Sequence, residues 1–291
     1  AGLDNGIDYV SLDMPLTNLY ITPYFKGAGY TALIHDHTLY LGTNRVLFYT
    51  EWPVQCKEDA TNWRLISALS GLVWGLEKIN DEIFCLHDKG VFSINNGKIT
   101  EIKGLRGGLT ACLHDDNPDK CWIGTYDGLF LAEKKQNRWI TQKINEVTGW
   151  MKDGIFESTH TLWLRDGYDG VIRFDLDPYT NNVKSSESYH HENGFESTED
   201  IRIHKIFGKT YFSNRSGIYR HDKKSNRIIK DKQLNELLPE NQIYTKIISF
   251  DSTLYAMSSD IISAVKFCND TPCQNTISFF NASQMGFIKW Y

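Results

Sequence analysis

Two stretches of the chain, YLGTNRVLF at residues 40–48 and WIGTYDGLF at residues 122–130, share one pattern. Each begins with an aromatic and an aliphatic residue, continues with Gly-Thr and a polar pair, and ends in an apolar run. Related units occur at residues 84–92, 163–172 and 211–219 and, in degenerate form, at 255–261. The chain is therefore built from an internal repeat, and its first residues, 2–9, fit the same unit without its opening strand.

The spacing of the repeat indicates its architecture. A turn glycine, or the residue in its place, stands at positions 6, 46, 90, 128, 170, 217 and 261, so that successive units are 38 to 47 residues apart. Within one unit, four short runs rich in β-branched and aromatic residues are separated by Asn, Asp, Gly or Pro. A period of this length with four strands per unit is typical of β-propeller blades, and the marker glycine is expected in a tight turn with positive φ.

Both ends of the chain suggest how the ring closes. Residues 2–9 would supply the later strands of one blade, and residues 286–291 look like its opening strand. Pairing them would complete a split blade and remove exposed sheet edges. We therefore predict a single all-β domain over residues 1–291, a seven-bladed β-propeller of four-stranded antiparallel blades with one blade closed by the N- and C-terminal strands. One short helix is expected where Leu234, Leu237 and Leu238 fall at i, i+3 and i+4 before Pro239.

Composition narrows the class of partner. The net charge of −5 comes from 31 basic and 36 acidic residues without a basic block, so nucleic acid is not expected as a partner. No run of 18 apolar residues is present, and we expect no membrane contact by this segment. The chain also lacks a signal-peptide pattern, which fits either a cytoplasmic protein or a domain excised from a longer one.

Four of the six cysteines fall into two pairs that flank turn-forming residues. Cys268 and Cys273 enclose Asn-Asp-Thr-Pro, and Cys112 and Cys121 enclose Pro118. Each pair is consistent with a cross-strand disulfide or with two buried thiols, and the sequence leaves both open.

The aromatic-aliphatic-Gly-Thr-x-x-Gly-Leu-aromatic unit resembles the two-component regulator propeller repeat, most closely at residues 2–9 and 71–92. In that family the propellers form the extracytoplasmic part of membrane-spanning sensors, including hybrid histidine kinases and one-component regulators linked to polysaccharide use. The resemblance implies a periplasmic sensor domain from a larger, inner-membrane-anchored transcription regulator. The partners it implies are an oligosaccharide or other small polar ligand, the neighbouring domains of the parent chain, and a second copy of the parent.

Motifs that would indicate an enzyme are missing from the sequence. It contains no HExxH, Walker or GxSxG motif, and we expect no catalytic residue, no cofactor and no metal site. Asp166 and Asp169, the His-Asp-His at 35–37 and the His pair at 190–191 are better explained as turn and loop residues. Two other functions stay open: a scaffold that docks another protein, and a carbohydrate-active lyase or glycosidase.

The turns that precede the marker glycines carry the most varied polar and aromatic side chains. An aromatic face combined with hydrogen-bonding groups suits a sugar or another polar ligand. The predicted ligand-binding residues are Arg45, Tyr126, Arg165, Tyr168 and Arg215. Arg165 and Tyr168 lead, because their loop is one residue longer than its counterpart at 122–128 and should project furthest. The aromatic residues that open the units are instead predicted to pack between blades: Tyr40, Phe84, Trp122, Trp163, Tyr211 and Tyr255.

Overall fold

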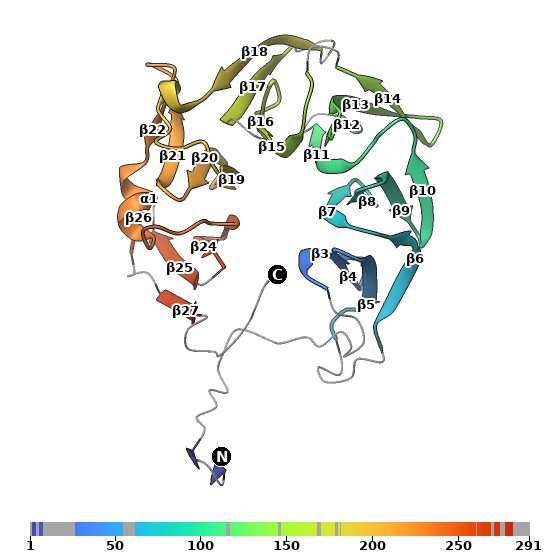
Figure 1. The fold of residues 1–291 in the computed structure, drawn as a ribbon, viewed down its shortest axis with the longest axis horizontal. Helices are drawn as coiled ribbons and strands as arrows, with labels where there is room; N and C mark the ends of the chain where they lie inside the picture. Colours follow the sequence, from blue (N-terminus) through green and yellow to red (C-terminus); the bar gives the residue numbers. More distant parts are fainter. Residues whose placement is uncertain are drawn as a thin grey trace.

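The structure is a computed structural model that describes the chain except residues 1, 4–5, 8–26, 55–61, 115–116, 145–146, 168–169, 178–179, 181, 260, 269–270, 274–276 and 282–291. Six antiparallel sheets are arranged as the blades of a β-propeller (Figure 1). In blades I to V, four strands follow one another along the chain, with the first nearest the ring axis and the fourth at the rim (Figure 1). The predicted all-β propeller of four-stranded antiparallel blades is thus confirmed.

The strands have the following bounds. Blade I contains β3 (Gly29–His35), β4 (Thr38–Thr43), β5 (Val46–Glu51) and β6 (Arg64–Ser70). Blade II contains β7 (Val73–Ile79), β8 (Glu82–His87), β9 (Gly90–Asn95) and β10 (Lys98–Ile102). Blade III contains β11 (Gly108–His114), β12 (Asn117–Thr125), β13 (Gly128–Lys135) and β14 (Arg138–Lys143).

The second half of the ring repeats this arrangement. Blade IV contains β15 (Met151–Ser158), β16 (Thr161–Asp166), β17 (Gly170–Leu176) and β18 (Val183–Tyr189). Blade V contains β19 (Arg202–Ile206), β20 (Lys209–Asn214), β21 (Gly217–Asp222) and β22 (Arg227–Lys230). Blade VI contains β23 (Lys246–Phe250), β24 (Thr253–Met257), β25 (Ile261–Cys268), β26 (Thr271–Pro272) and β27 (Ile277–Asn281).

The predicted number of seven blades is wrong, because the described residues form six. At the N-terminus, β1 (Gly2–Leu3) and β2 (Gly6–Ile7) pair with each other in a separate two-stranded sheet and join no blade. Blade VI is completed by its own strand β27, which pairs with β25. Residues 286–291, predicted to close the split blade, lie outside the described residues.

The core of the molecule lies between the blades rather than within them. Five hydrophobic clusters fill the five successive interfaces from blade I to blade VI. Phe84, Trp122 and Trp163 are completely buried in three of these clusters, and Tyr40 and Tyr211 pack partly buried against two others. The repeating aromatic residue at these five positions is therefore an inter-blade packing residue, as predicted.

The marker glycine is required by the geometry of the turn between the second and third strands. Gly90, Gly128, Gly170 and Gly217 all have φ between 122° and 157°, a region that other residues rarely adopt. At Gly128 a Cβ atom would also lie 2.2 Å from the carbonyl oxygen of Val147 in the connection to blade IV. The glycine therefore permits both the turn and the close approach of the next connection.

Hydrogen bonds also join the innermost strands of neighbouring blades. Leu76 N donates to Thr31 Oγ1 (3.3 Å), and Gly154 N donates to Thr110 Oγ1 (2.9 Å). Between blades V and VI, Ile247 N of β23 donates a hydrogen bond to the Nδ1 atom of His204 on β19 (3.2 Å). These bonds help to hold the innermost strands in fixed positions around the axis.

The expected helix is present as α1 (Lys232–Leu237), which follows blade V. Asp231 caps it, since the Asp231 carboxylate accepts a hydrogen bond from Leu234 N (2.9 Å). Leu234 is buried against blades V and VI together with Leu238. Among the described residues no helix is long and apolar enough to cross a membrane.

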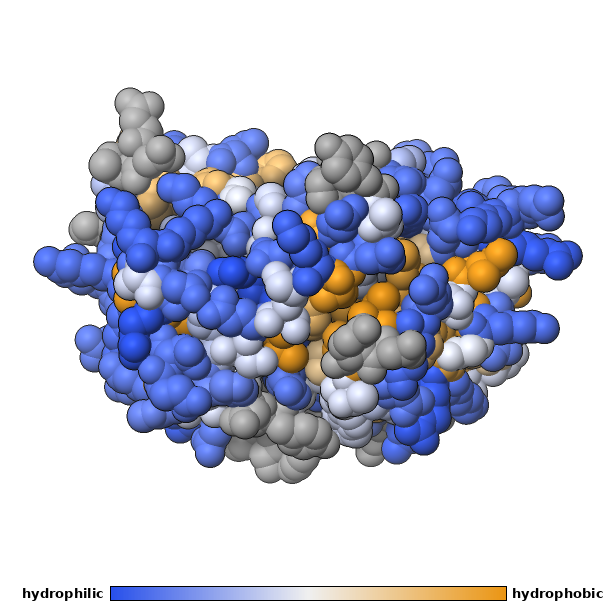
Figure 2. All heavy atoms as spheres, turned by 90° about the horizontal axis from the view of Figure 1, so that it is seen from above, coloured by the Kyte–Doolittle hydropathy of each residue, from blue (hydrophilic) through white to orange (hydrophobic). Residues whose placement is uncertain are grey.

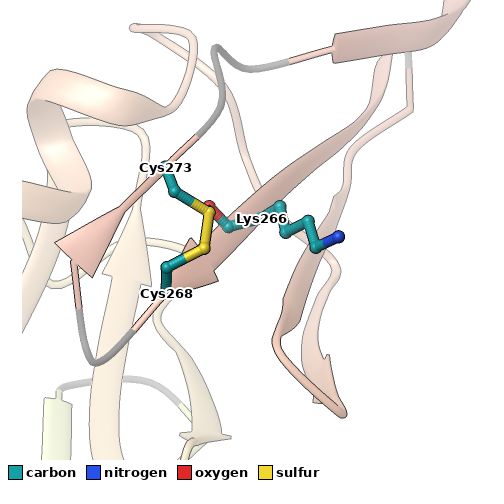
Figure 3. The surroundings of a disulfide bond; sticks show 3 residues. All are labelled: Lys266, Cys268 and Cys273. Atoms are coloured by element: carbon teal, nitrogen blue, oxygen red, sulfur yellow. A yellow bond between two sulfur atoms is a disulfide. The ribbon is translucent and has the colours of Figure 1, made fainter.

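The two cysteine pairs differ in state. Cys268 and Cys273 form a disulfide beside Lys266, whose carbonyl accepts a hydrogen bond from Cys273 N (Figure 3). Cys112 and Cys121 are free and buried. Cys112 lies opposite Trp122 rather than Cys121, so that the two thiols point to opposite faces of the sheet and belong to different inter-blade clusters.

Seen from the rim, the surface is mainly hydrophilic, and hydrophobic atoms gather in a limited area near the middle of the view (Figure 2). The reason is that the strands at the rim, such as β18 and β14, are rich in exposed polar residues.

Candidate functional site

The turns between second and third strands and the connections between blades lie on the same face of the ring, because the strands of each blade alternate in direction. This face is called the connection face below. Of the residues predicted to bind ligand there, Tyr126 is half-buried, Arg165 is buried, and Arg45 and Arg215 are exposed. Tyr168 lies outside the described residues.

Bulges near the connection face interrupt the innermost strands of blades I to IV. The pairing skips Tyr30 in β3, Trp74 in β7 and Leu109 in β11. In β15 it skips Asp153 and Gly154. A bulge leaves its extra residue unpaired and turns that side chain to a new direction. The bulges therefore set two aromatic side chains and one carboxylate apart from the regular pleat near the connection face.

Four aromatic side chains near the connection face form a continuous cluster. Trp74 Nε1 donates a hydrogen bond to the hydroxyl of Tyr126 (2.6 Å). The Tyr126 ring stacks on Trp150, with ring centroids 4.9 Å apart and an interplanar angle of 29°. Tyr30 contacts Trp74 edge to face at 5.9 Å. The cluster combines residues of blades I, II and III with the connection to blade IV, and we name it, with Lys152, the mouth cluster.

Lys152, on β15, is the cation of the mouth cluster. Its Nζ lies 4.9 Å from the ring centroid of Trp150 and 5.8 Å from that of Trp74, within the range of a cation–π contact. Burial lowers the pKa of the Lys152 ammonium, and the positive charges of Arg165 and Arg202 lower it further. None of the ion pairs found in the described part of the chain includes Lys152.

A second group of charges adjoins the mouth cluster. Arg165 Nε lies 2.9 Å from Asp153 Oδ2, and Arg202 Nη1 lies 3.3 Å from the same oxygen. Arg165 is a residue of β16, paired with Lys152 across the sheet, and does not extend from the loop that follows. Its burial lowers the pKa of its guanidinium, while Asp153 acts in the opposite direction.

Of the four predicted residues that the structure describes, Tyr126 and Arg165 are brought together. Tyr126 and Arg165 are linked through Lys152, which contacts the ring stacked on Tyr126 and pairs with Arg165 in the sheet. Among the described residues no hydrogen bond, ion pair or ring contact joins Arg45 or Arg215 to this group. Arg215 instead lines a cavity of about 530 Å³ next to α1.

Sequence reasoning missed Trp74, Trp150, Lys152, Asp153 and Arg202. They precede or open the innermost strands, whereas the predicted ligand-binding residues stand in or next to the turns before the marker glycines. A signal was present, since an aromatic residue directly follows a glycine at Gly29-Tyr30 and at Gly149-Trp150, in or just before the first strand of a blade. The bulges that displace Tyr30, Trp74 and Asp153 from the regular strand pairing are tertiary features.

The other polar groups weighed in the sequence lie in turns and connections. Asp36 and His37 have φ of 44° and 54° and form the tip of the β3–β4 hairpin, as expected. His190 precedes a 3₁₀ turn, η2 (His191–Asn193), in the connection to blade V. Asp166 ends β16, and Asp169 lies outside the described residues. Within the described residues no group of three or more His, Cys, Asp or Glu side chains is placed to hold a metal ion.

Comparison with known proteins supports the fold. No family model matches the chain, and no curated protein matches it in sequence. Two similar solved structures are named as the extracellular domains of a hybrid two component system and of a one component system, both from B. thetaiotaomicron. They share 11% identity with the chain, at TM-scores of 0.59 and 0.60, and each match covers 89% of this chain.

The chain spans only 35% and 38% of those two structures. A third structure, named for a 6-phosphogluconolactonase of Bacteroides fragilis, matches with 16% identity and a TM-score of 0.53 over 86% of this chain and 84% of its own length. At such identities the likeness concerns the fold. It confirms the β-propeller fold that the repeat predicted, and the structures matched include the extracellular domains of two regulator systems.

Proposed function

We propose that this chain is a non-catalytic sensor propeller of an extracytoplasmic signal-transduction regulator, and that it binds a carbohydrate at the mouth cluster. The observation that carries the proposal is the grouping of Trp74, Tyr126, Trp150 and Lys152 near the connection face. Aromatic faces pack against the C–H faces of sugar rings, and nearby polar groups provide hydrogen bonds and orientation.

The origin of the mouth cluster explains how binding would be sensed. Its side chains come from blades I to IV, so that one ligand would contact several blades at once. A ligand changes a conformational equilibrium only through different affinities for its two states. Contacts that depend on the relative positions of four blades supply such a difference.

The fold likeness supports the wider setting of the proposal. Two similar structures are named as extracellular domains of regulator systems, and both are longer than this chain. In our proposal the propeller faces the periplasm, its parent is anchored in the inner membrane, and the output is transcription regulation. Of the residues predicted from sequence, Tyr126 belongs to the mouth cluster and Arg165 to the adjoining charges. Arg45 and Arg215 remain predicted ligand contacts outside the mouth cluster, and Tyr168 remains a prediction that lies outside the described residues.

Calorimetric titration with a panel of neutral and acidic oligosaccharides tests the proposal. We expect at least one to bind, and Trp150→Ala to weaken that binding at least tenfold, because it removes a ring face and a contact of Lys152. Trp52→Ala is the matched control, since Trp52 is an exposed tryptophan in the segment after β5. Unchanged affinity in a folded Trp150→Ala protein, or no binding across the panel, would contradict the proposal.

A further inference from the structure

Positive charges outnumber negative charges in the mouth cluster and its immediate neighbours. Lys152, Arg165 and Arg202 interact with one another and with a single adjacent carboxylate, that of Asp153. The whole chain has a net charge of −5, so this is a locally positive region on an acidic protein. Such a region needs an explanation, because close like charges destabilise each other when they are partly removed from water.

Asp153 cannot neutralise the group by itself. Its Oδ2 atom receives both Arg165 and Arg202, so that one negative charge is shared by two cations. Lys152 is held over two indole rings and not over a carboxylate. A cation–π contact stabilises a cation less than a close, desolvated ion pair does, and it leaves the charge available.

Other charges in the surroundings reduce the excess without removing it. Asp200 acts on Arg165, and Glu77 of β7 lies among charges of both signs, because Lys246 of β23 and Asp153 both act on it. Desolvation and Asp153 raise the pKa of the Glu77 carboxyl, and Lys246 lowers it. Asp88 acts on Tyr126, and its Oδ1 atom lies 2.6 Å from Nδ1 of His87, a buried ring whose pKa is lowered by burial. None of these carboxylates lies within ion-pair distance of Lys152 among the described residues.

We infer that the ligand of the mouth cluster carries an anionic group, a carboxylate or a sulfate, that is placed beside Lys152. This inference rests on the proposed function and names the class of sugar. An acidic sugar presents a ring face to the aromatic side chains and a negative charge at its edge, which matches the order of groups in the site. A neutral sugar would cover Lys152 and leave it without a counter-charge, at a cost in desolvation.

Three oligosaccharides of similar length test the inference by calorimetry: an oligogalacturonate, a sulfated galactan fragment and a neutral galactan fragment. We expect a charged oligosaccharide to bind at least tenfold more tightly than the neutral one, and its affinity to fall as salt is raised. The two charged probes distinguish a carboxylate site from a sulfate site. Lys152→Met keeps an apolar chain over the rings, and we expect it to abolish most of the preference.

Two further variants keep the result interpretable. Arg202→Gln should reduce the preference for the charged ligand as well, and it provides a second measurement if Lys152→Met fails to fold. Lys98→Met, on the rim strand β10, removes an equal charge far from the axis and should change nothing. Equal binding of neutral and charged oligosaccharides, unaffected by Lys152→Met, would overturn the anionic ligand while leaving the sugar site intact. Absence of all binding would overturn the site itself.

Discussion

We predict that His204 makes the stability of the ring dependent on pH. The side chain lies in β19 with 2% of its surface exposed. Its Nδ1 atom accepts a hydrogen bond from Ile247 N of blade VI (3.2 Å), which places the proton on Nε2, where it is shared with Ser213 Oγ (2.7 Å). Protonation of Nδ1 would break the bond between blades V and VI.

The magnitude follows from the pKa. Burial lowers the pKa of His204 to about 3, against 6.5 for an ordinary histidine. Between these values the unfolded chain binds more protons than the folded one, so that the free energy of unfolding decreases as pH falls below about 6.5. From pH 7.5 to pH 5.0 we expect His204 to account for a loss of about 2 kcal/mol, at about 1.4 kcal/mol per pH unit once the unfolded histidine is protonated.

Urea unfolding at pH 7.5 and at pH 5.0 measures this loss. In His204→Asn the amide oxygen can still accept from Ile247 N but nothing titrates, so the decrease between the two pH values should be smaller by about 2 kcal/mol. His160→Asn, which replaces an exposed histidine, serves as the control and should keep the wild-type decrease. The reasoning fails if His204→Asn loses as much stability on acidification as the wild type.

Two further changes test the fold. Gly128→Ala should lower the free energy of unfolding by about 3 kcal/mol, because its Cβ would meet Val147 O. Gly97→Ala, at positive φ but with open space around it, should cost only about 1 kcal/mol. Equal effects in denaturant titrations would show that contact with the next connection does not matter. Replacing Cys268 and Cys273 by serine should cost about 2 kcal/mol or less, since the disulfide closes a short loop. A reductant should lower the stability of the wild type by the same amount and leave that of the serine variant unchanged. A loss of stability in the reduced variant would show that the effect of the reductant does not come from this disulfide.

The candidate site could be predicted only in part. Tyr126 and Arg165 were found because they stand in or next to the turns whose spacing the repeat reveals. Trp74, Trp150 and Lys152 were not found from the sequence. Their grouping depends on a bulge at Trp74 and on contacts between residues of different blades. Arg165 was expected in a projecting loop, yet it is buried in β16, where Asp153 provides its counter-charge.

The sequence by itself determined the blade, because alternation, turn glycines and the aromatic packing residue are local properties that repeat with a fixed period. Residues such as Trp122 and Trp163 could be assigned to the core for the same reason. The number of blades was decided by the tertiary structure, since β1 and β2 pair only with each other and blade VI supplies its own last strand. The state of Cys112 and Cys121 depended on strand register, and the mouth cluster depended on contacts between residues of different blades. No local sequence pattern encodes the state of these two cysteines or the grouping of the mouth cluster.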